Sequence, residues 1–170
     1  NYHCILIAKN YEGVKELNYL SSQSFNRNDG HFYYNPRITL EELENTSDNI
    51  FVLTACVAGM LCKGTAEVQE RFLKFIIKNK DRCWLEIQPH NFDLQIKYNQ
   101  YLYGISQKYD LKLIATSDIH AISKDHMNGR AVMQKSKNVD FHDEDLCDLS
   151  WKSYDDMVSA FEKQNAVARN

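Results

Sequence analysis

The sequence predicts an α/β fold in which parallel strands alternate with helices. Short apolar runs bounded by polar residues recur along the chain, and such runs are typical of strands that are covered on both faces. Segments of about ten or more residues with apolar positions at helical spacing lie between these runs, as the crossovers between parallel strands require. At 170 residues and 44% hydrophobic, the chain is long enough for one such domain.

Local patterns place the elements of the first half of the chain. Val14, Leu17 and Leu20 stand at helical spacing after the first apolar run, and Thr39 with Glu42 forms a capping box at a helix start. The predicted elements are a buried strand at 4–8, helices at 12–22 and 40–46, a strand at 50–54 and a helix at 66–79. The last helix carries an apolar stripe that would face a sheet, made of Val68, Phe72, Phe75 and Ile76.

The second half continues the alternation. Tyr98, Leu102 and Ile105 form the inward face of one long helix, and an acidic connector separates the last two helices. The predicted elements are strands at 83–87 and 112–116 and helices at 92–109, 124–138 and 154–164.

Composition bounds the classes of function. With a net charge of −3 and a pI near 6.1, the chain does not have the basic surface of a domain that grips a phosphate backbone by itself. Its apolar runs are too short for a membrane span, and its five cysteines show no CxxC spacing, so we expect a cytoplasmic protein without membrane contact. Because the chain begins with Asn1 and enters a strand-like run at once, we expect a piece of something larger.

Candidate ligand residues follow three of the predicted strands. Cys56 follows the second strand, His90 the third, and Asp118 with His120 the fourth. Loops that leave the carboxyl ends of parallel strands converge on one face, where ligands collect. Carboxylate and imidazole donors suit Zn²⁺, Mn²⁺ or Fe²⁺, and a thiolate would favour zinc. The alternative is a polar loop that only caps a helix, with Cys56 as a core filler.

Other residues receive weaker interpretations. His3 just before the first strand is ambiguous, and His90 is a candidate for orienting a metal ligand. Arg130, on a local basic segment, either belongs to a solvated face or holds a phosphate or a carboxylate. Three histidines are expected to be solvated, and three cysteines to serve packing: His31, His126 and His142, and Cys4, Cys62 and Cys83. No Gly-rich phosphate loop, P-loop lysine or Ser-centred elbow is present, which argues against a nucleotide triphosphatase or an α/β-hydrolase.

Six blocks in order are more specific than any single motif: "YHCILIAKNYEGVKELNYLSSQSF", "FYYNPRI", "TACVAGML", "LEIQPH", "ATSDIHAI" and "DLSWKSYDDM". Together they resemble the polymerase-and-histidinol-phosphatase (PHP) domain of the bacterial or phage-encoded DNA polymerase III alpha subunit. The resemblance covers essentially the whole chain. It implies a distorted (β/α)7 barrel whose strand ends hold up to three metal ions, with phosphoesterase or 3′–5′ exonuclease chemistry in some members.

The resemblance also implies ligands and partners. It puts His3, Cys56, Asp118 and His120 at metal-ligand positions, with Zn, Mn or Fe at this site and Mg for the parent polymerase. Residues 1–150 would be the C-terminal portion of the PHP domain, and 151–170 a helical segment leading toward the polymerase palm. The implied partners are the rest of the polymerase chain, a proofreading exonuclease subunit and, through the parent protein, DNA and dNTP.

The chain also departs from the family. The paired HxH motif, the DHG-type histidine and the GCE-type glutamate, all expected upstream of His3, are absent, as are the palm aspartates expected downstream. The implied barrel is therefore partial, and no catalytic residue is assigned. Three hypotheses stay open: a fragment, inactive by itself, of a DNA-directed DNA polymerase; an inactive structural module that binds a proofreading subunit; and a free-standing metal-dependent phosphoesterase.

Overall fold

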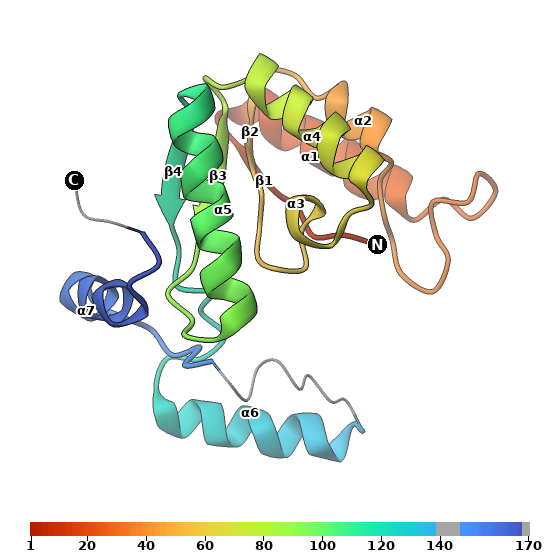
Figure 1. The fold of residues 1–170 in the computed structure, drawn as a ribbon. Coiled ribbons are helices and arrows are strands. Elements are labelled where there is room, and N and C mark those ends of the chain that lie inside the picture. The colour runs from red at the N-terminus through yellow and green to blue at the C-terminus, as the bar shows by residue number, and fades with distance from the viewer. Residues whose placement is uncertain (139–146, 168–170) are drawn as a thin grey trace. The chain divides into compact units, whose positions relative to one another are not determined.

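The computed structural model describes residues 1–138 and 147–167, in which helices and strands follow in the predicted order (Figure 1). The predicted bounds agree with the structure to within two residues, and β3 and α7 match them fully. A short helix that was not predicted, α3, follows the "ACVAG" turn. The elements are β1 (Ile5–Ala8), α1 (Tyr11–Ser24), α2 (Leu40–Glu44), β2 (Ile50–Leu53), α3 (Met60–Lys63), α4 (Ala66–Lys78), β3 (Cys83–Ile87), α5 (Asp93–Tyr109), β4 (Lys112–Ala115), α6 (Lys124–Ser136) and α7 (Tyr154–Gln164).

The chain divides into two compact units. The first consists of Asn1–Leu85 with Tyr109–Lys112, and the second of Glu86–Lys108 with Leu113–Asn170. β3 and β4 each begin in the first unit and end in the second. The candidate donors divide accordingly, since His3 and Cys56 belong to the first unit while the other donors belong to the second.

The strand order is β1-β2-β3-β4. β2 and β3 are parallel, with Val52 opposite Cys83, and α4 is the crossover that the sequence predicted between them. β1 departs from the prediction because it pairs antiparallel with β2. The expectation that this strand is buried on both faces is also wrong, since Ile5 and Ile7 are 37% and 46% exposed. Successive residues of a strand point to opposite faces, and the face that carries these two is open.

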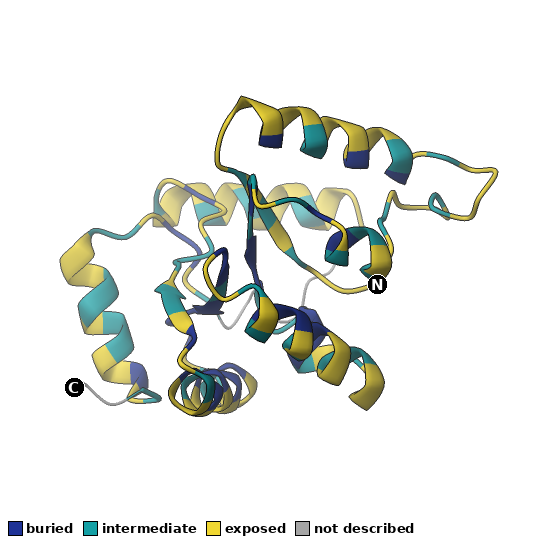
Figure 2. Cartoon of the chain, turned by 90° about the horizontal axis from the view of Figure 1, so that it is seen from above, coloured by how far each residue is buried: buried dark blue, intermediate teal, exposed yellow. Residues whose placement is uncertain are grey.

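The core of the first unit forms where apolar stripes meet. Phe72, Phe75 and Ile76 of α4 are buried as predicted, whereas Val68 is only partly covered. Figure 2 shows helices of the chain with dark blue, buried residues along one face and yellow, exposed residues along the other, as expected of amphipathic helices. The capping box of Thr39 and Glu42 is present at the start of α2. Other buried apolar side chains of this unit are Leu43, Ile50, Val52 and Leu85.

The second unit has a more polar interior. The predicted inward face of α5, made of Tyr98, Leu102 and Ile105, is buried. Buried with it are the amide side chains of Gln95, Asn99 and Gln164. Among the described residues of α6, none is buried. Within residues 1–138 and 147–167, no helix combines the length and the apolar character needed to cross a membrane.

Candidate metal centre

His3 and Cys56 lie side by side in the first unit, although 53 positions separate them in sequence. Their ring Nδ1 and thiol Sγ are 3.5 Å apart. The backbone fixes this approach: the His3 N–H donates to the Ala58 carbonyl at 3.0 Å, and the Gly59 N–H donates to the Cys56 carbonyl at 2.8 Å. His3 and Gly59 form an isolated parallel bridge. The small-residue turn after β2 thus presents the thiol to the imidazole.

Gly59 has to be glycine for this turn to close. A Cβ at this position would stand 2.3 Å from the Thr54 carbonyl oxygen and 3.0 Å from that of Cys56. Ala55, just before Cys56, has a φ of 60°, a left-handed conformation that costs free energy in a residue with a side chain. The turn therefore holds Cys56 in place at the expense of backbone strain.

The spacing of His3 and Cys56 fits a shared zinc ion. Zinc binds sulfur at about 2.3 Å and imidazole nitrogen at about 2.0–2.1 Å, so two such donors of a tetrahedral ion stand about 3.5 Å apart. The observed Sγ to Nδ1 distance is 3.5 Å. A weak contact between thiol and imidazole gives the same distance without metal. The distance between the two atoms is therefore compatible with a shared ion and does not require one.

A second group of donors lies in the second unit. His90 follows β3, and Asp118 and His120 follow β4. The His120 Nε2 is 3.1 Å from one carboxylate oxygen of Asp118, and the His90 Nε2 is 3.6 Å from the other. Asp118 has a φ of 49°, in the left-handed region, and its two carboxylate oxygens face one imidazole each. This arrangement brings together residues from two loops that the sequence predicted to meet.

Electrostatics keep Asp118 ionised. The contact with His90, first, and then the neighbouring His120 lower the pKa of the Asp118 carboxyl, while burial opposes them. His90 is 5% exposed, and its Nε2 has no hydrogen-bond partner among the described residues. At 3.6 Å the contact with Asp118 is too long for a good hydrogen bond. A buried imidazole nitrogen of this kind is suited to a cation or to a carboxylate that binds one.

The donor chemistry fits a divalent metal ion only in part. Imidazole and carboxylate are ligands for Zn²⁺, Mn²⁺ and Fe²⁺, and the thiolate adds a preference for zinc. In the part of the chain that the structure describes, no group of three or more His, Cys, Asp or Glu side chains has the geometry to hold one ion. Each cluster is thus a partial donor set, and the expected convergence of Cys56 with His90, Asp118 and His120 stays a prediction.

Among the remaining histidines, the interpretation of His31 was wrong. Its ring bridges Asp29 and Glu42, at 2.5 Å and 3.0 Å, and its side chain is only 14% exposed, because the loop after α1 folds back onto the start of α2. His126 is exposed as expected, and His142 lies outside the described residues.

The packing role expected of three cysteines agrees with the burial of only one of them, and the expected contact of Arg130 is not tested. Cys83 is buried, as a packing role requires, whereas Cys4 and Cys62 are only partly covered. Arg130 lies on α6 with intermediate exposure, and its predicted contact with a phosphate or a carboxylate stays a prediction.

Sequence analysis missed a polar network behind the second group. Gln164 of α7 and Asn99 of α5 share hydrogen bonds with each other and with the backbone of the turn that leads to His90. The sequence does contain one indication of this network. Asn99 lies four positions after Gln95 and three before Leu102, so all three residues fall on the buried stripe of α5. Amides at core positions of a helix need internal partners.

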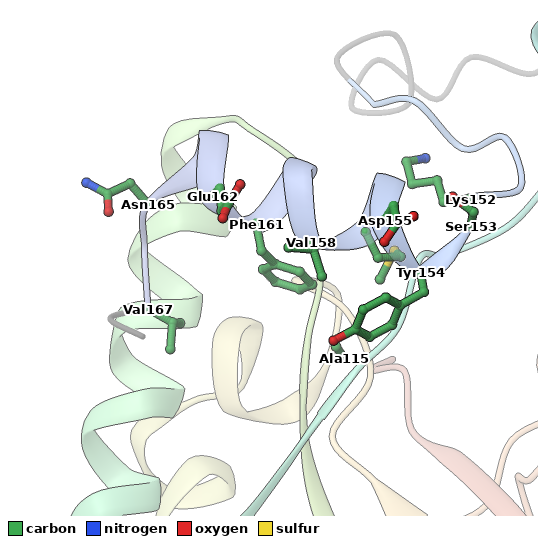
Figure 3. Close-up of a pocket in the computed structure, with 11 residues that line it drawn as sticks. Ala115, Lys152, Ser153, Tyr154, Asp155, Val158, Phe161, Glu162, Asn165 and Val167 are labelled. Atoms are coloured by element: carbon green, nitrogen blue, oxygen red, sulfur yellow. The ribbon is translucent and has the colours of Figure 1, made fainter. Parts of the chain in front are cut away.

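A pocket of about 1120 Å³ opens beside α7 in the second unit. Figure 3 shows Tyr154, Val158 and Phe161 on the same side of this helix, with Ala115 of β4 below them. The charged residues at its border, Lys152, Asp155 and Glu162, carry both signs. None of the candidate donors lines this pocket, so it is a separate feature of the unit.

Comparisons with known proteins agree with the resemblance. The family model described as PHP domain matches residues 1–90. The DNA polymerase III subunit alpha of Aquifex aeolicus (strain VF5) is 32% identical over 96% of this chain and 16% of its own length. Proteins of the same name from Borreliella burgdorferi and Thermus aquaticus are 29% and 28% identical over 78% of this chain, and over 12% and 11% of their own lengths. The chain thus spans about a sixth or less of these relatives.

Proposed function

Because the chain belongs to the PHP domain family, we propose that it is the C-terminal portion of the PHP domain of a bacterial or phage-encoded DNA polymerase III alpha subunit. In this proposal residues 1–150 form the PHP portion and 151–170 lead toward the polymerase palm. The parent protein would be a cytoplasmic DNA-directed DNA polymerase, a nucleotidyltransferase of DNA replication. The similarity to alpha subunits over 96% of the chain supports this assignment.

The proposed role of this portion is to supply donors for divalent metal at the strand ends. His3 and Cys56 would supply donors in the first unit, and Asp118 and His120 in the second, for metal of the kind used in phosphoesterase or 3′–5′ exonuclease chemistry. The observation that carries the proposal is the pairing of the donors, with His3 and Cys56 at the 3.5 Å separation that a tetrahedral zinc ion requires. When bound, Zn, Mn or Fe would activate water and neutralise charge on a phosphoryl group.

Within this site, the protein's own groups would orient the donors. His90 would hold the Asp118 carboxyl in its ionised form, which is the form that binds a cation. No residue of the chain is assigned as general acid or base. The parent polymerase would use Mg²⁺ at its own centre and would bring DNA, dNTP, the rest of the polymerase chain and a proofreading exonuclease subunit as partners.

The chain by itself should neither extend primers nor cleave DNA at a significant rate. The donors among residues 1–138 and 147–167 form partial sets, so water would fill the remaining positions of any bound ion. Primer-extension and exonuclease assays with Mn²⁺, run on the 170-residue chain and on Asp118→Ala, test this expectation. Cleavage by the parent chain that disappears in Asp118→Ala would contradict it and favour a free-standing phosphoesterase.

An inactive interaction module is the second candidate, and one observation favours it. The side of α7 that borders the pocket carries Tyr154, which is 82% exposed, together with Val158 and Phe161. A patch of this kind is typical of surfaces that other protein segments cover. On this hypothesis the chain would bind a proofreading subunit or the polymerase body and would hold no metal, so the metal titration that closes the Discussion separates the two candidates.

A further inference from the structure

Gln164, near the end of α7, is tied to the turn that carries His90. Its Nε2 donates to the carbonyls of Gln88 and His90, at 2.9 Å and 2.6 Å. Its Oε1 accepts from the Nδ2 of Asn99 at 2.8 Å, and that same Nδ2 donates to the Gln88 carbonyl at 2.8 Å. Gln164 and Asn99 are 5% and 0% exposed. Both donor hydrogens of Gln164 are therefore used on one turn of backbone, away from water.

The loop that carries Asp118 and His120 is held by the same C-terminal segment. The N–H groups of His120 and Ala121 donate to the Leu149 carbonyl at 2.9 Å and 3.2 Å. The Trp151 N–H donates back to the Ala121 carbonyl at 2.9 Å, which completes a short parallel bridge. One end of the segment 149–164 thus holds the Asp118 loop, and the other end holds the His90 turn.

These contacts meet at the His90–Asp118 pair. The Nε2 of His90 has no hydrogen bond among the described residues, and packing leaves it facing the Asp118 carboxylate at 3.6 Å. Because no direct bond between the two side chains sets this distance, the backbone on each side must set it. On the His90 side the restraint comes from Gln164, and on the Asp118 side it comes from the Leu149 carbonyl.

We infer that the segment 149–164 acts as a clamp that positions His90 against Asp118, with Gln164 as the positioning residue. Docking of α7 then sets the affinity of Asp118 and His120 for a divalent cation, so any movement of this helix would tune the site. The part of the inference that concerns metal rests on the proposed function. The part that concerns the geometry of His90 does not, and the two can be tested separately.

The clamp is tested in the 170-residue chain with Gln164→Met, which keeps the size of the side chain and removes its donors and its acceptor. Lys163→Ala, an exposed neighbour on the same turn of α7, is the matched control. Calorimetric titration with Mn²⁺ and the imidazole NMR signals of His90 without metal are compared at one pH. We expect Gln164→Met to bind Mn²⁺ about 10-fold more weakly or worse, and to shift the His90 signals, while Lys163→Ala matches the parent chain.

A folded Gln164→Met with parental Mn²⁺ affinity and parental His90 signals would overturn the inference. If the parent chain itself binds no Mn²⁺, the proposed metal site fails, and the His90 signals alone decide: a shift supports the clamp and an unchanged spectrum refutes it. If Gln164→Met does not fold, Ser153→Ala takes its place, because it removes the capping box of α7 without touching the amide network. It should shift the same signals in the same direction, and an unchanged spectrum would again refute the clamp.

Discussion

At the scale of single residues, the candidate donors are placed by neighbours that bind nothing themselves. Gly59 permits the turn that presents Cys56 to His3, and Ala55, with its left-handed backbone, directly precedes Cys56. Left-handed residues other than glycine carry strain that the surrounding structure has to support. Substitutions at such positions should therefore act on the site without removing a donor.

Replacing Gly59 by Ala should destabilise the protein. The new Cβ would meet the Thr54 carbonyl oxygen at 2.3 Å, and backbone cannot retreat as a flexible side chain can. We expect the free energy of unfolding, measured with chemical denaturant, to fall by about 2 kcal/mol. Gly104→Ala in the middle of α5 is the control, since nothing lies within 4 Å of its added Cβ. That change should raise stability by about 0.5–1 kcal/mol, and equal stability of the two variants would refute the steric argument.

His31 should make the loop at 25–38 sensitive to pH. Its bond to Asp29, first, and its bond to Glu42 raise the pKa of His31 above its ordinary 6.5, so its contribution is fully present below 6.5 and is lost as pH rises through the raised pKa. The hydrogen bond with His31 lowers the pKa of Asp29 below 3.8. The contribution of the Asp29 carboxylate to the stability of the loop is therefore lost only in stronger acid.

Amide exchange of the loop at 25–38 should therefore speed up on the alkaline side of the His31 titration. An NMR titration measures both the exchange rates of the loop and the protonation of the His31 ring. His31→Gln should remove the pH dependence. His126→Gln, which changes an exposed histidine of α6, should leave it as it is. Exchange rates that follow only the ordinary base catalysis of amide exchange in the parent chain would count against this role of His31.

At the scale of elements, buried Arg82 joins the ends of α2, β2 and α4. Its guanidinium donates to the Thr46 hydroxyl and carbonyl at 3.0 Å and 2.9 Å and to the Asn79 side chain at 3.1 Å, and it stacks on Phe75. Arg82→Lys keeps the charge but cannot reach all these acceptors. The free energy of unfolding should fall by about 2 kcal/mol or more. Lys80→Ala, which removes an exposed ion pair with Asp110, should change it by less than about 1 kcal/mol.

Local sequence specifies some of the helices and strands and not others. The stripe of α4 and the capping box of α2 were predicted because they depend on residues three or four positions apart. α3 was missed because it has only four residues and its cap, Gly59, makes no side-chain hydrogen bond. The exposure of β1 could not be predicted either, since an apolar run does not say whether a second layer covers it.

At the scale of the whole molecule, the sequence predicted the site only where residue spacing or the alternation of strands and helices specifies it, as for the loops of His90 and Asp118. Asp118 and His120 are two positions apart, and their proximity follows from the sequence. His3 and Cys56 were both assigned as ligands only through the family resemblance, because 53 positions separate them and the bridge that brings them together joins His3 to Gly59. Gln164 is 65 to 76 positions away in sequence from Asn99 and Gln88, its hydrogen-bond partners. No local sequence pattern predicts contacts between residues so far apart.

Calorimetric titration of the 170-residue chain with Zn²⁺ and Mn²⁺ shows whether Asp118 and His120 are metal donors. The comparison is with the double variant Asp118→Ala with His120→Ala, and His126→Ala serves as a control for loss of an ordinary histidine. We expect weak but measurable binding by the parent chain and by the control, since partial donor sets leave positions to water, and a clear loss in the double variant. Equal binding by the parent chain and the double variant would contradict it.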